Sequence, residues 1–459
     1  MTERTRRNTE LVMLVFSVAI AMAAYAAVGL AHDGVLPAGM VGYGAGLGVL
    51  FGIAHVALRR LAPYADPVLL PAVTLLNGLG LAMIHRLDLA YADRAEQLGR
   101  DIPSAAAPAQ LTWTAVGVAF FVAVLVLVRD HRVLQRFTYT AMVVGLGLLL
   151  LPLLPLIGTT INGARIWIRL FGFSFQPGEL AKLVLLVFFA GYLVVKRDVL
   201  ALAGRRVLGV DLPRARDLGP VLVAWVASLG VLVFERDLGS SLLFFGLFVA
   251  LLYVATERLS WLLIGVVLFL SGSFVAWTLF GHVRERVDIW LNAFAPRNVG
   301  DDSYQLVQGL FGLGTGGLLG KGLGQGRPDI VPYAQTDFIV AAVGEELGLT
   351  GLMAVLLLYA IVVERGLRTS IAVRDSFGKL LAAGLAFSVA LQVFVVVGGV
   401  TRLIPLTGLT TPFLSYGGSS LVANWALAAL LLRISDAARR PAPPPETPLT
   451  DAKTQVVRL

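Results

Sequence analysis

The sequence predicts an all-α polytopic membrane protein with about twelve transmembrane helices and one large extracytoplasmic loop. Three observations predict this class. Of the 459 residues, 57% are hydrophobic and only 14% are charged, whereas a soluble domain usually carries about 25% charged residues. The apolar residues are gathered in runs of about twenty, which is the length of helix that crosses a bilayer. The charged residues fall between these runs.

The apolar runs divide the chain from end to end. The first, 11–30, follows a short basic start and holds a small-residue pattern that suits signal cleavage, at Ala24, Tyr25 and Ala26. It is longer than a signal core, so we expect a retained helix, with a second at 36–58. Further spans are expected at 67–84, 111–128, 138–157, 180–195, 218–234, 239–255, 261–280, 338–363, 380–400 and 420–433. The Pro-rich polar tail, 437–459, is predicted to be disordered.

The Lys and Arg residues predict the orientation of the chain. With a cytoplasmic N-terminus, roughly twice as many of them lie inside as outside, which agrees with the positive-inside rule. Both termini are then cytoplasmic, and the 281–336 loop, the Arg165 loop and the Tyr416 loop face outward. The net charge of +8 comes from short basic clusters between apolar runs. That pattern is typical of contact with anionic membrane lipid and argues against nucleic-acid binding.

Several kinds of site are excluded by residue type. The chain has no cysteine, so it has no disulfide, thiolate metal site or thiol catalysis, and its five histidines lack the spacing of zinc ligands. Gly312, Gly314 and Gly317 match the dinucleotide-binding pattern but lie between membrane spans. Gly322 stands where a P-loop needs Ser or Thr after Lys321. We therefore expect neither a bound nucleotide nor zinc.

The stretch 281–348 holds much of the polar chemistry of the chain. Its glycines between 312 and 326 permit close approach of the backbone, or they serve as flexible spacing. Four cations in it are suited to hold a phosphate or diphosphate, or they form a solvated collar at the membrane interface. These cations are Arg284, Arg286, Lys321 and Arg327.

Carboxylates also occur at membrane depth, where a charge is costly and usually pairs or serves a site. They are Asp237, Asp337, Glu345 and Glu346, and Glu179 with Lys182. Glu179 and Lys182 are three residues apart and share one face of a helix, so a structural pair and a substrate contact both remain open. The first turns of the 338–363 span are expected to line a protein cavity rather than face lipid.

Seven blocks between these spans together resemble the SEDS family of cell-wall proteins, of the RodA/FtsW type. The blocks are NGARIWI (162–168), FQPGELAK (175–182), RDLGSSL (236–242), YQLVQ (304–308), GLLGKGLGQG (317–326), TDFIVAAVGEELGLTG (336–351) and PLTGLTTPFLSYGGSS (405–420). The likeness covers 67–436, and the C-terminal blocks are most similar to actinobacterial members of the RodA type. It implies an extra pair of helices at 1–66, a ten-helix core at 67–436, and the tail at 437–459.

The resemblance implies a function. Proteins of this family polymerise lipid II, the undecaprenyl-diphosphate-linked disaccharide pentapeptide, at the outer face of the bacterial cytoplasmic membrane, usually with a class B penicillin-binding protein. We therefore expect an inverting peptidoglycan glycosyltransferase that serves cell elongation and shape. A divalent cation, magnesium or manganese, would assist the diphosphate through one or two carboxylates. A lipid II flippase and a weakly catalytic scaffold for the penicillin-binding protein are the alternatives.

The resemblance also implies a set of cavity residues, by matching positions. Among them, the cations Arg165 and Lys182 suit the diphosphate. The carboxylates either contact substrate or fix the cavity by pairing with those cations. The full set is Arg165, Trp167, Gln176, Glu179, Lys182, Asp237, Tyr304, Gln305, Asp337, Glu345, Ser415 and Tyr416.

The chain departs from the family pattern at the general base. Glycosyl transfer from a diphosphate needs a carboxylate that takes the proton of the acceptor hydroxyl. The family places it in an Asp-Pro-x-x-x-Gly-Tyr-Gln pattern, whereas this chain reads NVGDDSYQ, with Asn298 and Val299 at the ungapped Asp-Pro positions. We predict Asp302 and Asp301 as the catalytic carboxylates. Asp288 is a more distant candidate, and reduced or absent catalysis is the third possibility.

Overall fold

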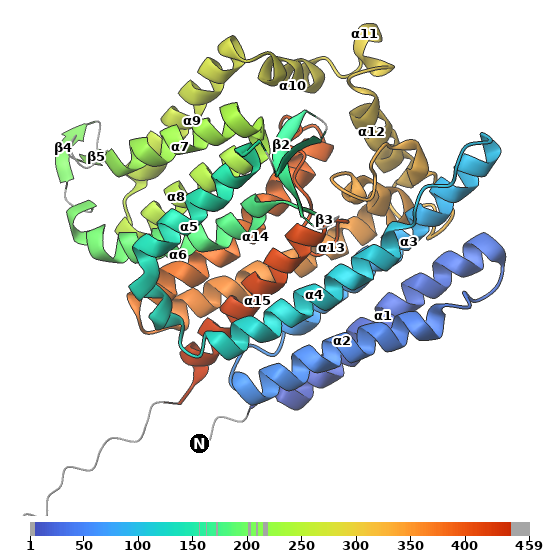
Figure 1. The fold of residues 1–459 in the computed structure, drawn as a ribbon, viewed down its shortest axis with the longest axis horizontal. Helices are drawn as coiled ribbons and strands as arrows, with labels where there is room; N and C mark the ends of the chain where they lie inside the picture. The colour runs from blue at the N-terminus through green and yellow to red at the C-terminus, as the bar shows by residue number, and fades with distance from the viewer. Residues whose placement is uncertain are drawn as a thin grey trace, which may run out of the picture.

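The computed structural model describes residues 5–155, 157–161, 163–170, 173–200, 203–207, 210–213 and 219–441. Within them, eleven helical segments are long and apolar enough to cross a membrane (Figure 1). They are α1 (Arg7–Asp33), α2 (Met40–Leu61), α3 (Leu69–Gln97), α4 (Ala106–Leu127), the His131–Leu153 segment that contains α5 (Thr138–Leu150), α6 (Pro177–Leu200), α8 (Leu238–Thr256), α9 (Leu259–Leu279), α13 (Ile339–Ala372), α14 (Ser376–Val400) and α15 (Gly418–Arg439).

These helices confirm the predicted membrane class. Every expected span overlaps a helix, and the one expected at 218–234 corresponds to α7 (Gly219–Glu235), which has only 17 residues. The ends of the His131–Leu153 segment are the 3-10 turns η1 (His131–Phe137) and η2 (Leu151–Leu153). Residues 437–439, expected in the disordered tail, continue α15 instead, and the tail from residue 442 lies outside the described residues.

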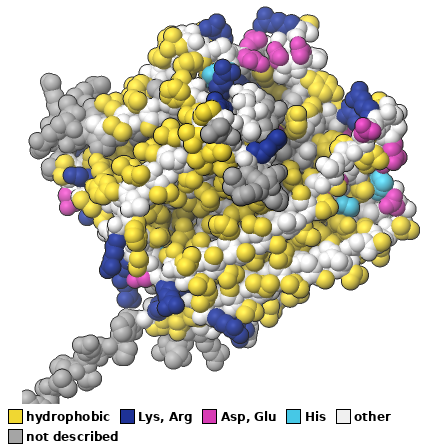
Figure 2. All heavy atoms as spheres, in the orientation of Figure 1, with side chains coloured by type: hydrophobic (Ala, Val, Ile, Leu, Met, Phe, Trp, Pro, Cys, Tyr) yellow, Lys and Arg dark blue, Asp and Glu magenta, His cyan; other side chains and the backbone are white. Residues whose placement is uncertain are grey.

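Hydrophobic side chains form a broad belt on the face shown in Figure 2, and the charged side chains gather toward its two ends. The lipid-facing helices contribute strongly to such a belt: on α9, for example, Val267 is 65% and Leu270 is 60% exposed. Apolar side chains in this number would be unfavourable in water and are favourable against lipid chains. The chain is therefore a multi-pass membrane protein.

Trp425 on α15 joins several helices in the interior. Its ring lies within 6.0 Å of the ring centroids of Phe51, Phe121 and Phe413, which come from α2, α4 and the loop before α15. Gly117 makes room for it, since a Cβ there would lie 2.5 Å from the indole ring. The indole N–H donates to the side chain of Asn77 on α3, at 3.3 Å. One aromatic cluster thus ties the N-terminal pair, through α2, to the rest of the bundle.

Two small antiparallel sheets depart from the all-α expectation (Figure 1). Strands β1 (Gly158–Ile161), β2 (Ala164–Leu170) and β3 (Phe173–Phe175) follow the α5 segment, with Gly158 opposite Ile168 and Ile168 opposite Phe175. Strands β4 (Ala203–Val207) and β5 (Val210–Pro213) pair between α6 and α7. In β2, Arg165, Trp167 and Arg169 alternate with the aliphatic residues Ile166, Ile168 and Leu170, which suits a strand at a surface.

Candidate functional site

The glycine-rich stretch folds back onto a break in α13. It follows α10 (Gly281–Leu291), α11 (Pro296–Val299) and α12 (Tyr304–Gly316), and precedes the turn η4 (Pro328–Ile330). Gly348 interrupts α13 with φ 69° and ψ −173°, a conformation open almost only to glycine. The N–H groups of Lys321 and Gly322 donate to the carbonyls of Glu345 and Glu346, at 3.0 and 2.9 Å. The stretch is therefore held by backbone bonds and is not flexible spacing.

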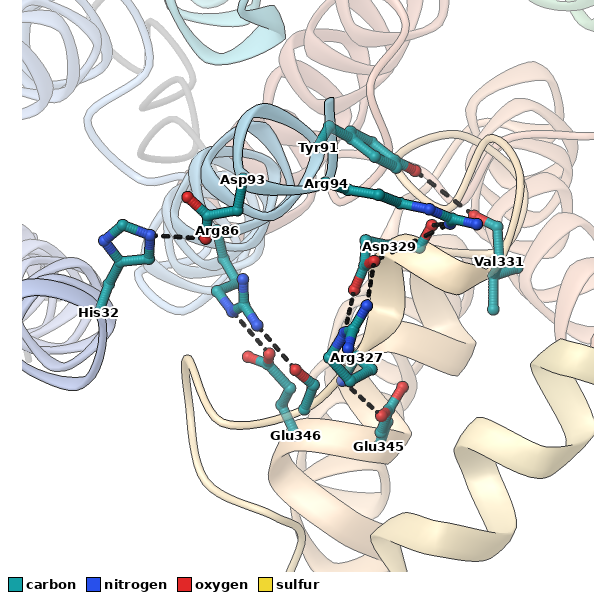
Figure 3. Close-up of polar contacts among 11 residues, drawn as sticks. His32, Arg86, Tyr91, Asp93, Arg94, Arg327, Asp329, Val331, Glu345 and Glu346 are labelled. Atoms are coloured by element: carbon teal, nitrogen blue, oxygen red, sulfur yellow. Dashed lines mark hydrogen bonds and ion pairs between the residues drawn. The ribbon is translucent and has the colours of Figure 1, made fainter. Parts of the chain in front are cut away.

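The side chains of Glu345 and Glu346 point into this stretch and are both buried. Arg86 on α3 donates through Nε to Glu346, at 2.8 Å, and through Nη2 to the carbonyl of Gly326, at 2.9 Å (Figure 3). Glu346 also accepts from the N–H of Gly324, at 3.0 Å, and Glu345 from the N–H of Arg327, at 2.7 Å. Both carboxylates thus anchor a loop, as the expectation of a protein-lined cavity implies.

The remaining charges of this region are paired in the same way. Arg327 makes a two-pronged contact with Asp329, at 3.0 and 3.2 Å, which raises the pKa of the guanidinium. Arg94 donates to the carbonyl of Asp329, at 2.5 Å, and His32 on α1 contacts Asp93 on α3, at 2.8 Å (Figure 3). A cavity of about 270 Å³ lies among these side chains. We call this cavity, with Arg86, Arg94, Arg327 and their partners, the loop-end cluster.

A second polar cluster lies inside the bundle between α6 and α14. Lys182 donates to Glu179, at 3.0 Å, and to the side-chain oxygen of Gln392, at 2.8 Å. Gln392 in turn donates to the carbonyl of Thr410, at 2.8 Å. Lys182 is only 2% exposed, so its ammonium group interacts with protein groups rather than with solvent. The structure places the predicted Glu179–Lys182 pair together and extends it to the loop before α15.

Asp237 is the residue immediately before α8, and it lies near Glu179 of the second polar cluster. Its carboxylate accepts from the N–H of Ser240, at 3.0 Å, and from the hydroxyl of Ser240, at 2.6 Å. It also lies close enough to Glu179 for the two charges to interact. An aspartate at this position caps a helix, so the local reason for the residue is structural as well as electrostatic.

Arg286 lies in the wall of an apolar cavity, and its positive charge acts on the carboxylate of Asp337. The cavity, of about 400 Å³, lies beneath α10 and is lined mostly by apolar side chains of α8, α9 and the 403–407 loop, with Arg286 in its wall. Arg286 donates to the carbonyl of Leu406, at 3.2 Å. Burial raises the pKa of the Asp337 carboxyl, and the hydrogen bond from Thr336 and the charge of Arg286 only partly offset this. A cation thus stands in the wall of a cavity that suits an apolar chain, and its charge acts on the carboxylate of Asp337.

The carboxylates predicted as the base differ in their surroundings. Asp301 and Asp302 are exposed in the turn between α11 and α12, and their side chains contact no polar group among the described residues. Asp288 on α10 is held by the side chains of Asn292, at 2.6 Å, Asn298, at 3.1 Å, and Arg297, at 3.0 Å. These hydrogen bonds, with the charge of Arg297, lower the pKa of Asp288.

The other predicted residues lie in several places. The guanidinium of Arg165 donates to carbonyls at the base of its own sheet, those of Pro152 and Leu154. Gln305 donates to the carbonyl of Pro332, at 2.8 Å, and Arg284 to that of Thr278, at 2.8 Å. The structure thus gathers only part of the predicted set. Trp167, Gln176 and Tyr304 are half-buried, Lys321 is exposed, Ser415 is buried, and the N–H of Tyr416 donates to the carbonyl of Gln335, at 2.7 Å.

Two residues that organise these clusters were missed in the sequence. Arg86 lies in the second half of α3, which also carries Arg94, and Gln392 is a lone amide in α14; they are 4% and 1% exposed. A polar residue inside an apolar run is costly unless it has a partner, which is the signal that pointed to Lys182 and could have pointed to Gln392. Arg86 follows the apolar run expected at 67–84, so this signal did not mark it. Among the described residues, no three His, Asp or Glu side chains gather as a metal site.

The comparison with known families decides the identity of the fold. The sequence model of the FtsW, RodA and SpoVE family, described as "Cell cycle protein", matches residues 67–440. The chain belongs to this family. The match begins in the turn before α3, so it contains both polar clusters and the cavity beneath α10.

This FtsW/RodA/SpoVE protein has relatives along its whole length. Peptidoglycan glycosyltransferase RodA of Mycobacterium tuberculosis is 55% identical over 458 residues, which cover 99% of this chain and 96% of that protein. The protein of the same name from Mycobacterium leprae is 53% identical over 456 residues, with coverage of 99% and 96%. A solved structure titled "Structural coordination of polymerization and crosslinking by a peptidoglycan synthase complex" aligns with a TM-score of 0.55 at 26% identity, over 87% of this chain and 98% of that chain.

Proposed function

We propose that this chain is a peptidoglycan glycosyltransferase that polymerises lipid II at the outer face of the cytoplasmic membrane during cell elongation. One observation carries the proposal: 55% identity over 99% of the chain with proteins named peptidoglycan glycosyltransferase RodA. Both termini are then cytoplasmic, and α10 to α12 lie outside. The proposed domain division is the α1–α2 pair at 1–66, the core at 67–436 and the tail.

The proposed reaction joins two sugars. A hydroxyl of the acceptor attacks the anomeric carbon of the donor, the bond to the diphosphate oxygen breaks, and the polyprenyl diphosphate leaves with inversion at that carbon. A carboxylate takes the hydroxyl proton. The cation that meets the departing diphosphate is Arg286, because it stands in the wall of an apolar cavity of about 400 Å³ that suits the start of the polyprenyl chain. Lys182 and Arg165 are engaged with protein groups, so they would act only after exchanging those partners.

Asp302 and Asp301 remain the first candidates for the base, since they are exposed and free to reach a substrate. A specific contact favours Asp288 as the second. Asn298 occupies the position of the family's aspartate, and its amide donates to Asp288 at 3.1 Å. The chain therefore keeps a carboxylate next to that position, on another residue. The hydrogen bonds that lower the pKa of Asp288 make it a weaker proton acceptor than an unpaired aspartate, so it would act only after exchanging some of these partners.

A divalent cation fits this proposal only through the substrate. Magnesium usually takes one or two carboxylates together with substrate phosphates, and the described residues offer no larger ligand set. Asp337, beside Arg286, is the carboxylate best placed for that role. Magnesium or manganese would then lower the charge of the departing diphosphate.

The test is polymerisation of labelled lipid II by the purified chain, alone and with its cognate class B penicillin-binding protein. We expect glycan from the wild type, and a loss of about 100-fold or more when the base is removed. Asp301→Ala with Asp302→Ala, and separately Asp288→Asn, identify the base. Asp101→Ala, an exposed carboxylate in the α3–α4 connection, is the matched control and keeps full activity.

The outcomes also separate the competing functions. Full activity in every carboxylate variant would remove the assigned base and direct attention to Asp337. Wild-type protein that makes no glycan with its partner, yet binds the penicillin-binding protein tightly, would establish the scaffold that the altered NVGDDSYQ segment suggests. Movement of lipid II across vesicle membranes without polymer would establish the flippase.

A further inference from the structure

The described chain begins and ends at the same end of the bundle (Figure 1), and a large cavity lies among the residues next to both ends. Its volume is about 990 Å³, which is in the range of pockets that hold a small molecule. Four segments build it: the start of α1, the turn between α2 and α3, the last turns of α13, and the end of α15. It is lined by Thr5, Arg6, Asn8, Thr9, Met13, Tyr64, Ala65, Pro67, Val68, Arg365 and Arg439.

The lining of this cavity has an excess of positive charge. Arg6, Arg365 and Arg439 line it, and no carboxylate among the described residues does. Asp66, which is fully buried, pairs with Arg439 and lies 3.7 Å from Arg365. The Nε of Arg365 also lies 3.3 Å from Glu364, which contacts Arg368 as well. Two carboxylates thus serve these three arginines, and the side chain of Arg6 has no polar partner among the described residues.

The same cavity also has an apolar side. Met13 and Val68 belong to its wall. On α1, beside Met13, Val12 and Phe16 are 55% and 63% exposed, on a helix that the bilayer surrounds. A molecule with a negative head and an apolar body would place its head among the arginines and its body along α1. Hydroxyl and amide groups of Thr5, Thr9 and Asn8 add neutral hydrogen-bond donors beside the charges.

We propose that this cavity is a binding site for the phosphate headgroup of an anionic membrane phospholipid, whose acyl chains lie along the outer face of α1. Arginine holds phosphate through several directed N–H bonds, and basic pockets between transmembrane helices are typical headgroup sites. The site lies at the opposite end of α3 from the Gly-rich loop, so it is separate from the proposed glycosyl-transfer site.

The test measures lipid retention by the full-length purified protein in detergent, by native mass spectrometry, with phosphatidylglycerol or phosphatidylcholine added. We expect selective retention of phosphatidylglycerol. Arg6→Gln weakens it about fivefold, and Arg6→Gln with Arg365→Gln about 25-fold, since each arginine near a membrane surface contributes about 1 kcal/mol. Arg60→Gln, an exposed arginine at the end of α2 outside the cavity, is the matched control and leaves retention unchanged.

Two further measurements keep the result unambiguous. Arg6 has no polar contact among the described residues and Asp66 keeps Arg439, so both variants should unfold at the temperature of the wild type. Phosphatidylglycerol should raise that temperature for the wild type only. Equal retention of both lipids, or an equal loss in Arg60→Gln, would overturn the proposal. Displacement of the lipid by inorganic phosphate or glycerol phosphate at the same concentration would assign the site to free phosphate instead.

Discussion

Two arginine-lined cavities lie at opposite ends of α3, and they use their cations differently. At the loop end, Arg86 and Arg327 each hold a carboxylate within 3.0 Å, and Arg94 holds a backbone carbonyl. At the terminal end, Arg365 and Arg439 share the carboxylate of Asp66, Arg365 also pairs with Glu364, and the side chain of Arg6 has no polar partner among the described residues. Figure 2 shows the same contrast on the face in view, with acidic and basic side chains mixed at the top and right and mostly basic ones at the lower left. A count of cations alone would have ranked the two cavities equally.

The difference teaches which cations are available to a ligand. A buried charge is costly unless it is paired, and once paired it contributes to the position of the chain around it. The loop-end arginines hold the Gly-rich stretch against α13, so they act on the proposed reaction through the loop. The arginines at the terminal end outnumber the carboxylates that pair with them, so they attract an anion from outside the protein. Three predictions test this contrast, from the largest expected effect to the smallest.

The largest effect is expected at the Arg86–Glu346 pair. Glu346→Gln removes the charge that faces Arg86, whose side chain is only 5% exposed. An unpaired charge at such a site usually costs about 3–5 kcal/mol of unfolding free energy. Denaturant unfolding in detergent measures this loss, and release of the 320–327 stretch should appear as new cleavage by protease under native conditions.

The control for that prediction comes from the other end of α3. Arg365→Gln leaves Asp66 paired with Arg439, so it should cost about 1 kcal/mol or less. Replacement of both partners, Arg86→Met with Glu346→Met, should recover most of the loss, because no buried charge then remains. Equal costs for Glu346→Gln and Arg365→Gln would contradict the distinction between the two ends.

A smaller effect is expected from the backbone at the break in α13. Gly348→Ala forces a side chain into φ 69°, and the new Cβ would lie 2.2 Å from the backbone nitrogen of Gly320. Such a strained residue costs about 1–3 kcal/mol. The unfolding midpoint measures it. Gly314→Ala on α12, where a Cβ meets nothing within 4 Å, is the matched control and should be neutral or slightly stabilising.

The sequence predicted the helices well because hydropathy is a local property of a run of residues. It also indicated that Glu345 and Glu346 face protein rather than lipid. It did not supply their partners, since Arg86 lies 260 residues from Glu346 and the pairing exists only after α3 packs on α13. For the same reason, the sequence left a structural pair and a substrate contact both open for Lys182 and did not supply Gln392, from a helix 210 residues further on, as its partner. The all-α expectation overlooked β2 because its alternation is only seven residues long.

The smallest effect concerns the stability of the terminal end at acidic pH, where the carboxylate of Asp375 accepts hydrogen bonds from two groups. Asp375 precedes α14 and accepts from His131, at 2.8 Å, and from the N–H of Gly378, at 2.7 Å. Burial raises the pKa of Asp375, but these hydrogen bonds and the charges of His131 and Arg132 outweigh it, so the folded pKa lies below the ordinary value. The resulting stabilisation is present above about pH 4 and is lost as the pH falls through the folded pKa.

Asp375→Asn isolates that contribution, because asparagine keeps the helix cap and loses only the charge. At neutral pH the variant should be less stable than the wild type by about 1 kcal/mol or less, since the group is partly screened by solvent. The difference should shrink as the pH falls through the folded pKa of Asp375, because protonated aspartate has no charge to lose. Asp198→Asn, whose side chain is 94% exposed, should show neither effect. A gap between wild type and Asp375→Asn that widens toward low pH would mean that the terminal end holds Asp375 in its neutral form. The positive charge around Asp375 would then be too weak to offset the burial of its carboxyl group.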